Sequence, residues 1–132
     1  MRPEALEYVR YRLDRANEAV EEAELLFGRG HLSTTVNRLY YACFYAVSAL
    51  LLSEGQSSIK HSGVRALFDR HWIKTGRLPV EMGRFYRFLF DQRHKGDYDD
   101  LATFDPAAVE TWLAEAKKFV DEISAFIKED AS

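Results

Sequence analysis

Basic and imidazole side chains are concentrated in the middle of the chain, where they can bind an anion and exchange protons near neutral pH. Residues 60–95 hold nine basic and three acidic side chains, a net charge of +6, whereas residues 1–59 carry −2 and residues 96–132 carry −7. The basic and imidazole side chains of this region include Lys60, His61, Arg65, Arg70, His71, Arg84, Arg87, Arg93, His94 and Lys95. We therefore expect an anionic ligand to bind this basic region, although the overall pI near 5.8 argues against nonspecific binding of duplex nucleic acid.

The sequence lacks the short motifs by which most enzyme classes are identified. The chain contains no phosphate-binding glycine loop, no HExxH or GxSxG motif and no ferritin-like carboxylate cluster. Its single cysteine, Cys43, can form neither an internal disulfide nor a thiolate zinc site. We predict neither a metal nor a cofactor, and we expect a reducing, cytoplasmic location because no secretory leader is evident.

The elements that must position these residues are all expected to be helices. Apolar residues recur every three or four positions over residues 3–28, 31–54, 79–96 and 106–127, and Ser62 is placed to cap a shorter helix that ends near Thr75. Short connections between them predict a single all-α domain over residues 1–132, an antiparallel up-and-down bundle of four to five helices. The most apolar stretch, residues 39–52, is too short to cross a membrane and is expected to be a buried helix.

Aromatic residues exceed what one bundle core requires. The chain has nine Phe, seven Tyr and two Trp. Four of them, Tyr40, Tyr41, Phe44 and Tyr45, surround more than one side of the second predicted helix. We therefore expect some of these rings to form the interface of a homodimer.

Three segments resemble the small bacterial and archaeal HEPN-domain proteins. They are Asn37-Arg38-Leu39-Tyr40-Tyr41-Ala42-Cys43-Phe44, Lys60-His61-Ser62-Gly63-Val64 and Arg93-His94-Lys95-Gly96-Asp97-Tyr98. The resemblance covers nearly the whole chain in order. It implies a dimeric helical bundle and a frequent partnership with a small nucleotidyltransferase, in which the HEPN protein is often the toxin of a toxin–antitoxin pair and acts as a metal-independent ribonuclease.

The resemblance also implies which residues would cleave RNA. Active members carry an arginine followed by four to six residues and a histidine, and both Arg87 with His94 and Arg65 with His71 have such spacing. Histidine supplies a proton-transfer group with a pKa near 7, and arginine supplies a cation for the phosphate. The common R-N-x-x-x-H-x-Y string is missing, and Arg93, Asp97 and Tyr98 match a branch in which catalysis is less well supported.

These observations lead to three sets of candidate residues. The catalytic candidates are Arg87, Arg93 and His94, and the candidates for binding substrate or nucleotide are Lys60, His61, Lys95, Asp97 and Tyr98. The resemblance also implies that a partner nucleotidyltransferase can transfer AMP to a tyrosine that follows the histidine, which makes Tyr98 a candidate for this modification. Gly96 and Asp97 are expected to form an exposed turn that such an enzyme could reach. Each has a purely structural alternative: an ion pair between Arg93 and Asp97, a loop hydrogen bond for His61, and packing for the Tyr98 ring.

Two functions follow, with a third left open. The first is a toxin-like RNA-binding protein that acts as an endoribonuclease if the catalytic residues are competent. The alternative is a non-catalytic subunit that presents a nucleotide or substrate to a separate nucleotidyltransferase. The third is a purely structural interaction protein.

Overall fold

The protein, a computed structural model, is described over residues 2–131 and consists there of helices and connecting turns without a strand. The helices are α1 (Pro3–Gly28), α2 (Leu32–Ser53), α3 (His61–Phe68), α4 (Val80–Tyr98) and α5 (Pro106–Ala131), and a π-helical turn, η1 (Asp69–Ile73), follows α3. The predicted all-α bundle is therefore confirmed. Over the described residues, no helix is both long and apolar enough to cross a membrane.

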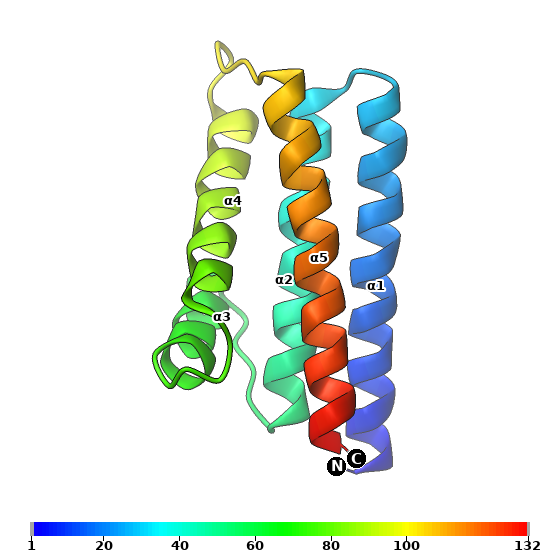
Figure 1. Cartoon of the computed structure of the whole chain (residues 1–132), viewed down its shortest axis with the longest axis vertical. Helices are drawn as coiled ribbons and strands as arrows, with labels where there is room; N and C mark the ends of the chain where they lie inside the picture. Colours follow the sequence, from blue (N-terminus) through cyan, green and yellow to red (C-terminus); the bar gives the residue numbers. More distant parts are fainter. Residues whose placement is uncertain (1, 132) are drawn as a thin grey trace.

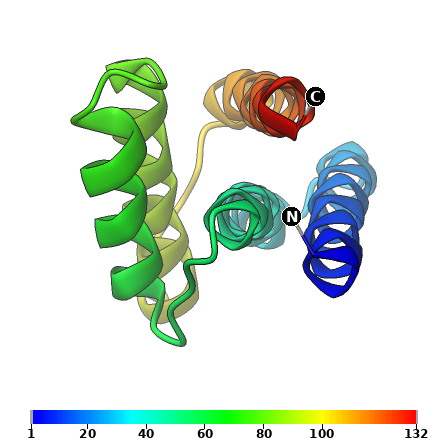
Figure 2. The same ribbon diagram turned by 90° about the horizontal axis from the view of Figure 1, so that it is seen from below.

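Helix α2 lies at the centre of the bundle. Viewed along the helices, α2 lies between α1 on one side and α3 with α4 on the other, and α5 covers a third side (Figure 2). The long helices run alternately up and down, and the two ends of the chain lie at the same end of the bundle (Figure 1). Because neighbours cover α2 on several sides, it buries polar Thr35 and Ser48 together with the apolar residues of both its faces.

A tight turn joins α1 to α2. Gly30 adopts φ +78°, a left-handed conformation that a side chain would disfavour. The Thr35 hydroxyl then donates a hydrogen bond to the carbonyl oxygen of His31, 2.7 Å away, in the first turn of α2. The predicted end of the first helix at residue 28 is confirmed.

The predicted start and end of the third helix are wrong. The helix begins at His61 and not after Ser62, because Ser58 stabilises the preceding turn by accepting a hydrogen bond from the Lys60 amide at 3.3 Å. It also does not continue as one α-helix to Thr75, since residues 69–73 form the π-helical turn η1. There the Lys74 amide donates to the carbonyl oxygen of Asp69 at 2.8 Å, while Trp72 stays fully buried.

The predicted break at Gly96, and the exposed turn at Gly96 and Asp97, are also wrong, because α4 continues to Tyr98. A side chain at residue 96 would place its Cβ 2.9 Å from Ser33 Oγ and 3.1 Å from the Phe104 ring. The missing side chain instead allows Ser33 at the start of α2 to donate a hydrogen bond to the Gly96 carbonyl oxygen at 3.2 Å. Glycine serves helix packing here and does not end the helix.

Candidate functional site

Arg93 lies in the contact between α4 and α2. Its guanidinium carbon is 5.2 Å from the centre of the Tyr40 ring and 5.3 Å from that of Tyr41. Its Nε donates a hydrogen bond to Asp97 Oδ2 at 3.1 Å, one helical turn further along α4. The same carboxylate oxygen accepts a hydrogen bond from Asn37 Nδ2 at 3.2 Å. The Arg93 side chain is only 17% exposed, so its position is fixed by two rings and one carboxylate.

His61 approaches the same tyrosines from the start of α3. Its Nδ1 lies 2.7 Å from the hydroxyl oxygen of Tyr40. Its ring stacks on Phe44 with 4.3 Å between ring centres and meets the Tyr41 ring edge-on at 5.8 Å. Gly63 keeps this end of α3 close to the preceding turn, because a Cβ there would lie 2.1 Å from Ser58 Oγ. Helix α3 therefore delivers an oriented imidazole to the side chains of α2.

These contacts unite the three sequence segments that carry the resemblance. We call the group the motif cluster and define it as Asn37, Tyr40, Tyr41, His61, Arg93 and Asp97. The first three belong to α2, His61 to α3, and the last two to α4. Segments separated by about 20 to 60 positions along the chain thus form one continuous set of contacts.

Burial and nearby cations set the protonation of the cluster. Burial raises the pKa of Tyr40 to about 12, because a buried phenolate is poorly solvated, and this outweighs the opposite effects of the Tyr86 hydroxyl and of Arg93. The pKa of His61 is lowered by burial and then by the positive charge of Arg93. At neutral pH the cluster therefore contains a protonated tyrosine, a neutral imidazole and a guanidinium.

Two further arginines border the cluster. The Arg38 guanidinium lies 5.0 Å from the Tyr41 ring centre and donates to Glu22 at 3.3 Å. The Arg65 guanidinium lies 4.8 Å from the ring centre of Phe90. Arginines stacked on half-buried rings have little freedom to lose on binding, which favours recognition of a phosphate or a nucleobase.

The other predicted residues of α4 lie outside this set of contacts. His94 and Tyr98 are exposed and contact each other, with 4.7 Å between ring centres. Lys95, in the same turn, is also exposed. Arg87 is exposed two turns before His94. Burial raises the pKa of Asp69, and the positive charges of Arg65 and Arg87 reduce this shift. Within the described chain, no contact joins Arg87 to Arg93 or His94.

The remaining candidates also separate from one another. Lys60, the residue before His61, is exposed at the start of α3. His71, the partner of Arg65 in the second predicted arginine–histidine pair, instead contacts Trp72, with 6.1 Å between ring centres. The structure therefore places His61, Arg93 and Asp97 together and leaves Lys60, Arg87, His94, Lys95 and Tyr98 on the surface.

Sequence comparison places these residues in a known family. The model of the HEPN domain matches residues 9–126. The chain belongs to the HEPN domain family. An HEPN relative from Thermotoga maritima, named as a UPF0332 protein, is 44% identical over 121 residues, which are 92% of each chain.

Two HEPN relatives carry the name "Putative toxin", both from Methanocaldococcus jannaschii. One is 30% identical over 115 residues, covering 87% of this chain and 78% of its own. The other is 34% identical over 115 residues, covering 86% of this chain and 84% of its own.

Sequence reasoning missed four residues of this site as functional candidates: Asn37, Arg38, Tyr40 and Tyr41. All four lie in the α2 segment that carried the resemblance, but a tyrosine on an apolar helical stripe is indistinguishable from core by spacing alone. The signal available was the polar pair Asn37-Arg38, which is separated from the two tyrosines only by Leu39. On a mostly buried helix such a pair needs polar partners, and Asp97 and Glu22 supply them.

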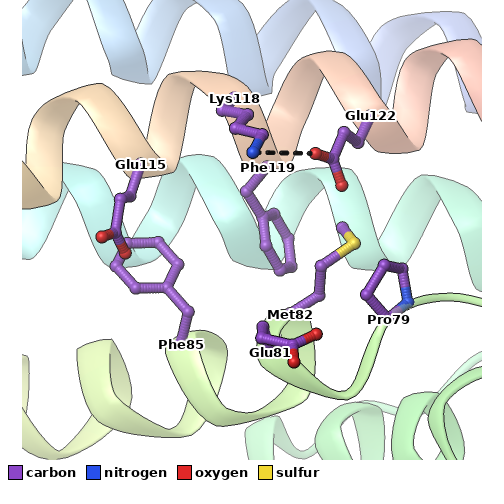
Figure 3. Close-up of a pocket in the computed structure, with 8 residues that line it drawn as sticks. All are labelled: Pro79, Glu81, Met82, Phe85, Glu115, Lys118, Phe119 and Glu122. Carbon is purple, nitrogen blue, oxygen red and sulfur yellow. Dashed lines mark ion pairs between the residues drawn. The ribbon is translucent and has the colours of Figure 1, made fainter.

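A separate cavity of about 410 Å³ lies between the first half of α4 and the middle of α5. Figure 3 shows its apolar residues, including Met82, Phe85 and Phe119, together with acidic Glu81, Glu115 and Glu122. Lys118 pairs with Glu122 at 3.7 Å. None of the predicted site residues lines this cavity, and its acidic edge is unsuited to an anion.

Proposed function

We propose that this HEPN protein is a toxin-like RNA-binding protein whose motif cluster contacts the RNA backbone. The observation that carries the proposal is the arrangement of Arg93, which is stacked on two rings and paired with Asp97 through Nε. Its two terminal nitrogens make no hydrogen bond to any described residue. They are therefore fixed donors for a phosphate oxygen.

The half-buried rings favour single-stranded RNA over a duplex. Tyr41 and Phe44 are partly exposed on α2, and such rings can stack on the faces of unpaired bases. The net charge of +6 over residues 60–95 adds attraction that does not depend on sequence. Single-stranded RNA combines the phosphates and the unpaired bases that this surface would recognise.

Binding is tested by the fluorescence anisotropy of a labelled single-stranded RNA. Arg93→Ala is expected to weaken binding about 10-fold or more, because a charge-assisted hydrogen bond and its stacked cation are lost. Arg10→Ala is the matched control, since it removes the same charge from an exposed position on α1. It is expected to change the affinity less than about 2-fold. Equal losses in the two variants would contradict the proposal.

RNA cleavage is a further step that Arg87 and His94 would perform. Both side chains are exposed and lie two helical turns apart on α4, about 10 Å along the axis. Purified protein is incubated with total RNA in EDTA, beside Arg87→Ala/His94→Ala. Cleavage by the wild type that is lost in the variant would assign the activity, and intact RNA in both would restrict the function to binding.

The alternative is a non-catalytic subunit that presents a nucleotide to a separate nucleotidyltransferase. Two observations favour it. Arg93 is held in place by Asp97, as a binding residue would be, and the exposed His94 lies outside the motif cluster. Under this alternative, AMP competes with RNA for the motif cluster, and RNA stays intact in EDTA. The two readouts together separate the two functions.

Both functions include assembly with other chains. We propose a homodimer and a nucleotidyltransferase partner, and an interface between two copies should bury more than about 1,000 Å² in total. The partly exposed ring of Tyr45 on α2, which is not among the rings assigned to RNA, supports such an interface. Light scattering at micromolar concentration is expected to give twice the 15.3 kDa mass of the chain, and a single-chain mass would remove the dimer.

A further inference from the structure

His61 is held by contacts that a packing role alone does not require. Its Nδ1 lies 2.7 Å from Tyr40 Oη, and its ring stacks on Phe44 of α2 with 4.3 Å between ring centres. The other ring nitrogen, Nε2, has no hydrogen-bond partner among the described residues. His61 is only partly buried, and its Nε2 is exposed to solvent. The imidazole therefore has one nitrogen fixed inside the protein and one presented outward.

The Tyr40 hydroxyl determines which nitrogen carries the proton. This mostly buried hydroxyl lies within hydrogen-bonding distance of His61 Nδ1 and also interacts with the buried hydroxyl of Tyr86. Both buried O–H groups have an acceptor only if Tyr86 donates to Tyr40 and Tyr40 donates to Nδ1. Neutral His61 then carries its proton on Nε2 and presents a hydrogen-bond donor to solvent.

Arg93 borders the same two rings as His61. The guanidinium lies against Tyr40 and Tyr41, and the imidazole contacts both rings at 5.7 Å and 5.8 Å between centres. Arg93 is close enough for its charge to lower the pKa of His61. Both side chains have outward donors that no described residue uses, and both are restrained by stacking and by a hydrogen bond. Such an arrangement recognises an anion with several acceptor oxygens.

We propose that His61 and Arg93 form a phosphate-binding site in which Tyr40 fixes the imidazole as an Nε2–H donor. The ligand is the phosphate group of a nucleotide or of the RNA backbone. Arg93 supplies the charge and His61 a directed neutral donor, so the site accepts a phosphate oxygen without a metal ion. This assignment rests on the proposed RNA binding and specifies which side chains touch the phosphate.

The first test uses ¹⁵N-histidine NMR at neutral pH. The resonances of His31, His61, His71 and His94 are assigned by single substitutions to Gln. His61 is expected to show the Nε2–H tautomer in the wild type, and Tyr40→Phe is expected to release this preference while retaining the ring. Titration with inorganic phosphate, and separately with AMP, should shift the His61 nitrogens in the wild type and not in Arg93→Ala.

The second test measures RNA affinity by anisotropy in His61→Gln and in the matched control His71→Gln. His61→Gln is expected to weaken binding about 10-fold, and His71→Gln less than about 2-fold. If Arg93→Ala weakens RNA binding while His61→Gln does not, and phosphate leaves the His61 nitrogens unshifted, this site is wrong and the RNA proposal stands. If RNA does not bind while phosphate and AMP still shift His61, the site stands for a free nucleotide and the RNA proposal fails.

Discussion

The second half of α4 presents two faces that differ in what holds their side chains. Arg93 and Asp97 face α2 and are held by ring stacking and by hydrogen bonds within and between helices. His94 and Tyr98, each one position further along, face solvent and contact mainly each other. A shift of one residue on a helix turns a side chain by about 100°, so adjacent residues of one motif have entirely different surroundings.

This contrast separates positions that the fold fixes from positions that it leaves free. Side chains of the inner face are oriented before any ligand arrives, so binding there costs little conformational entropy. Side chains of the outer face can be changed or modified without disturbing the bundle. Substitutions on the inner face should therefore alter both stability and binding, whereas those on the outer face should alter function alone.

The largest expected effect is on stability and compares two tyrosines. Tyr40 is 1% exposed and at the centre of the motif cluster, whereas Tyr98 is 70% exposed. Tyr40→Ala should lower the free energy of unfolding by about 3–5 kcal/mol, because it removes a buried ring and leaves a cavity. Tyr98→Ala should change it by less than about 0.5 kcal/mol. Urea denaturation of both variants measures the difference, and similar losses would abolish the distinction between the faces.

High pH should destabilise the inner face. The folded state raises the pKa of Tyr40 from 10.0 to about 12 and so keeps a proton that the unfolded chain releases. The contribution of Tyr40 to the free energy of unfolding is therefore complete below pH 10. It falls by about 1.4 kcal/mol per pH unit as the pH rises toward 12. Burial raises the pKa of Tyr86 as well, and this adds a loss of the same sign. Urea denaturation at pH 9 and pH 11 should show a smaller loss in Tyr40→Phe than in the wild type.

Low pH should act on the same cluster through His61. Its folded pKa is lowered, so the unfolded chain binds a proton more readily than the folded one does. The contribution of His61 is complete above the unfolded pKa near 6.5 and decreases as the pH falls below it. In urea denaturation at pH 5 and pH 7.5, His61→Gln should therefore lose less stability on acidification than the wild type. An equal loss in the two proteins would show that folding does not lower the His61 pKa.

Salt should weaken RNA binding by counterion release. If about three phosphates are contacted, raising the salt from roughly 50 to 200 mM should lower the affinity by about 20-fold for a single strand. Arg93→Ala should show a shallower salt dependence than the wild type, since one phosphate contact is lost. An affinity that does not change with salt would remove the role assigned to the basic region.

The smallest structural effect is expected from modification of Tyr98. This side chain is exposed at the last residue of α4, where a second enzyme can reach its hydroxyl. Co-expression with a nucleotidyltransferase partner should increase the intact mass by one AMP, with no change in the unfolding transition. An increase that persists in Tyr98→Phe would place the modification elsewhere, and no increase at all would contradict the prediction.

The fold was predictable because apolar spacing and glycine positions encode long helices directly. The five helices and the ends of α1 and α2 follow from local sequence. Gly96 and Ser62 misled, because their roles depend on tertiary neighbours. Glycine is typical of a helix end, but Gly96 lies inside α4, where its missing side chain leaves room for Ser33 and Phe104. Ser58, and not Ser62, stabilises the turn before α3.

The candidate site was predictable only in part. Arg93, Asp97 and His61 came from the family resemblance, and the structure brings them to the same pair of tyrosines. Arg87 with His94 came from spacing, and spacing on one helix cannot tell which neighbour each side chain faces. Tyr40 and Tyr41 were predicted as interface rings and not as site residues, because a ring that supports a cation has the same helical position as a core residue.

The most direct test of this account compares Arg93→Ala with His94→Ala in one RNA titration. Both variants remove a nitrogen-containing side chain from adjacent positions of α4, one from the inner and one from the outer face. The account predicts that Arg93→Ala weakens binding by about 10-fold or more and that the loss in His94→Ala is no more than about 3-fold. A greater loss in His94→Ala, in a variant that remains folded, would place the RNA on the outer face and contradict the account.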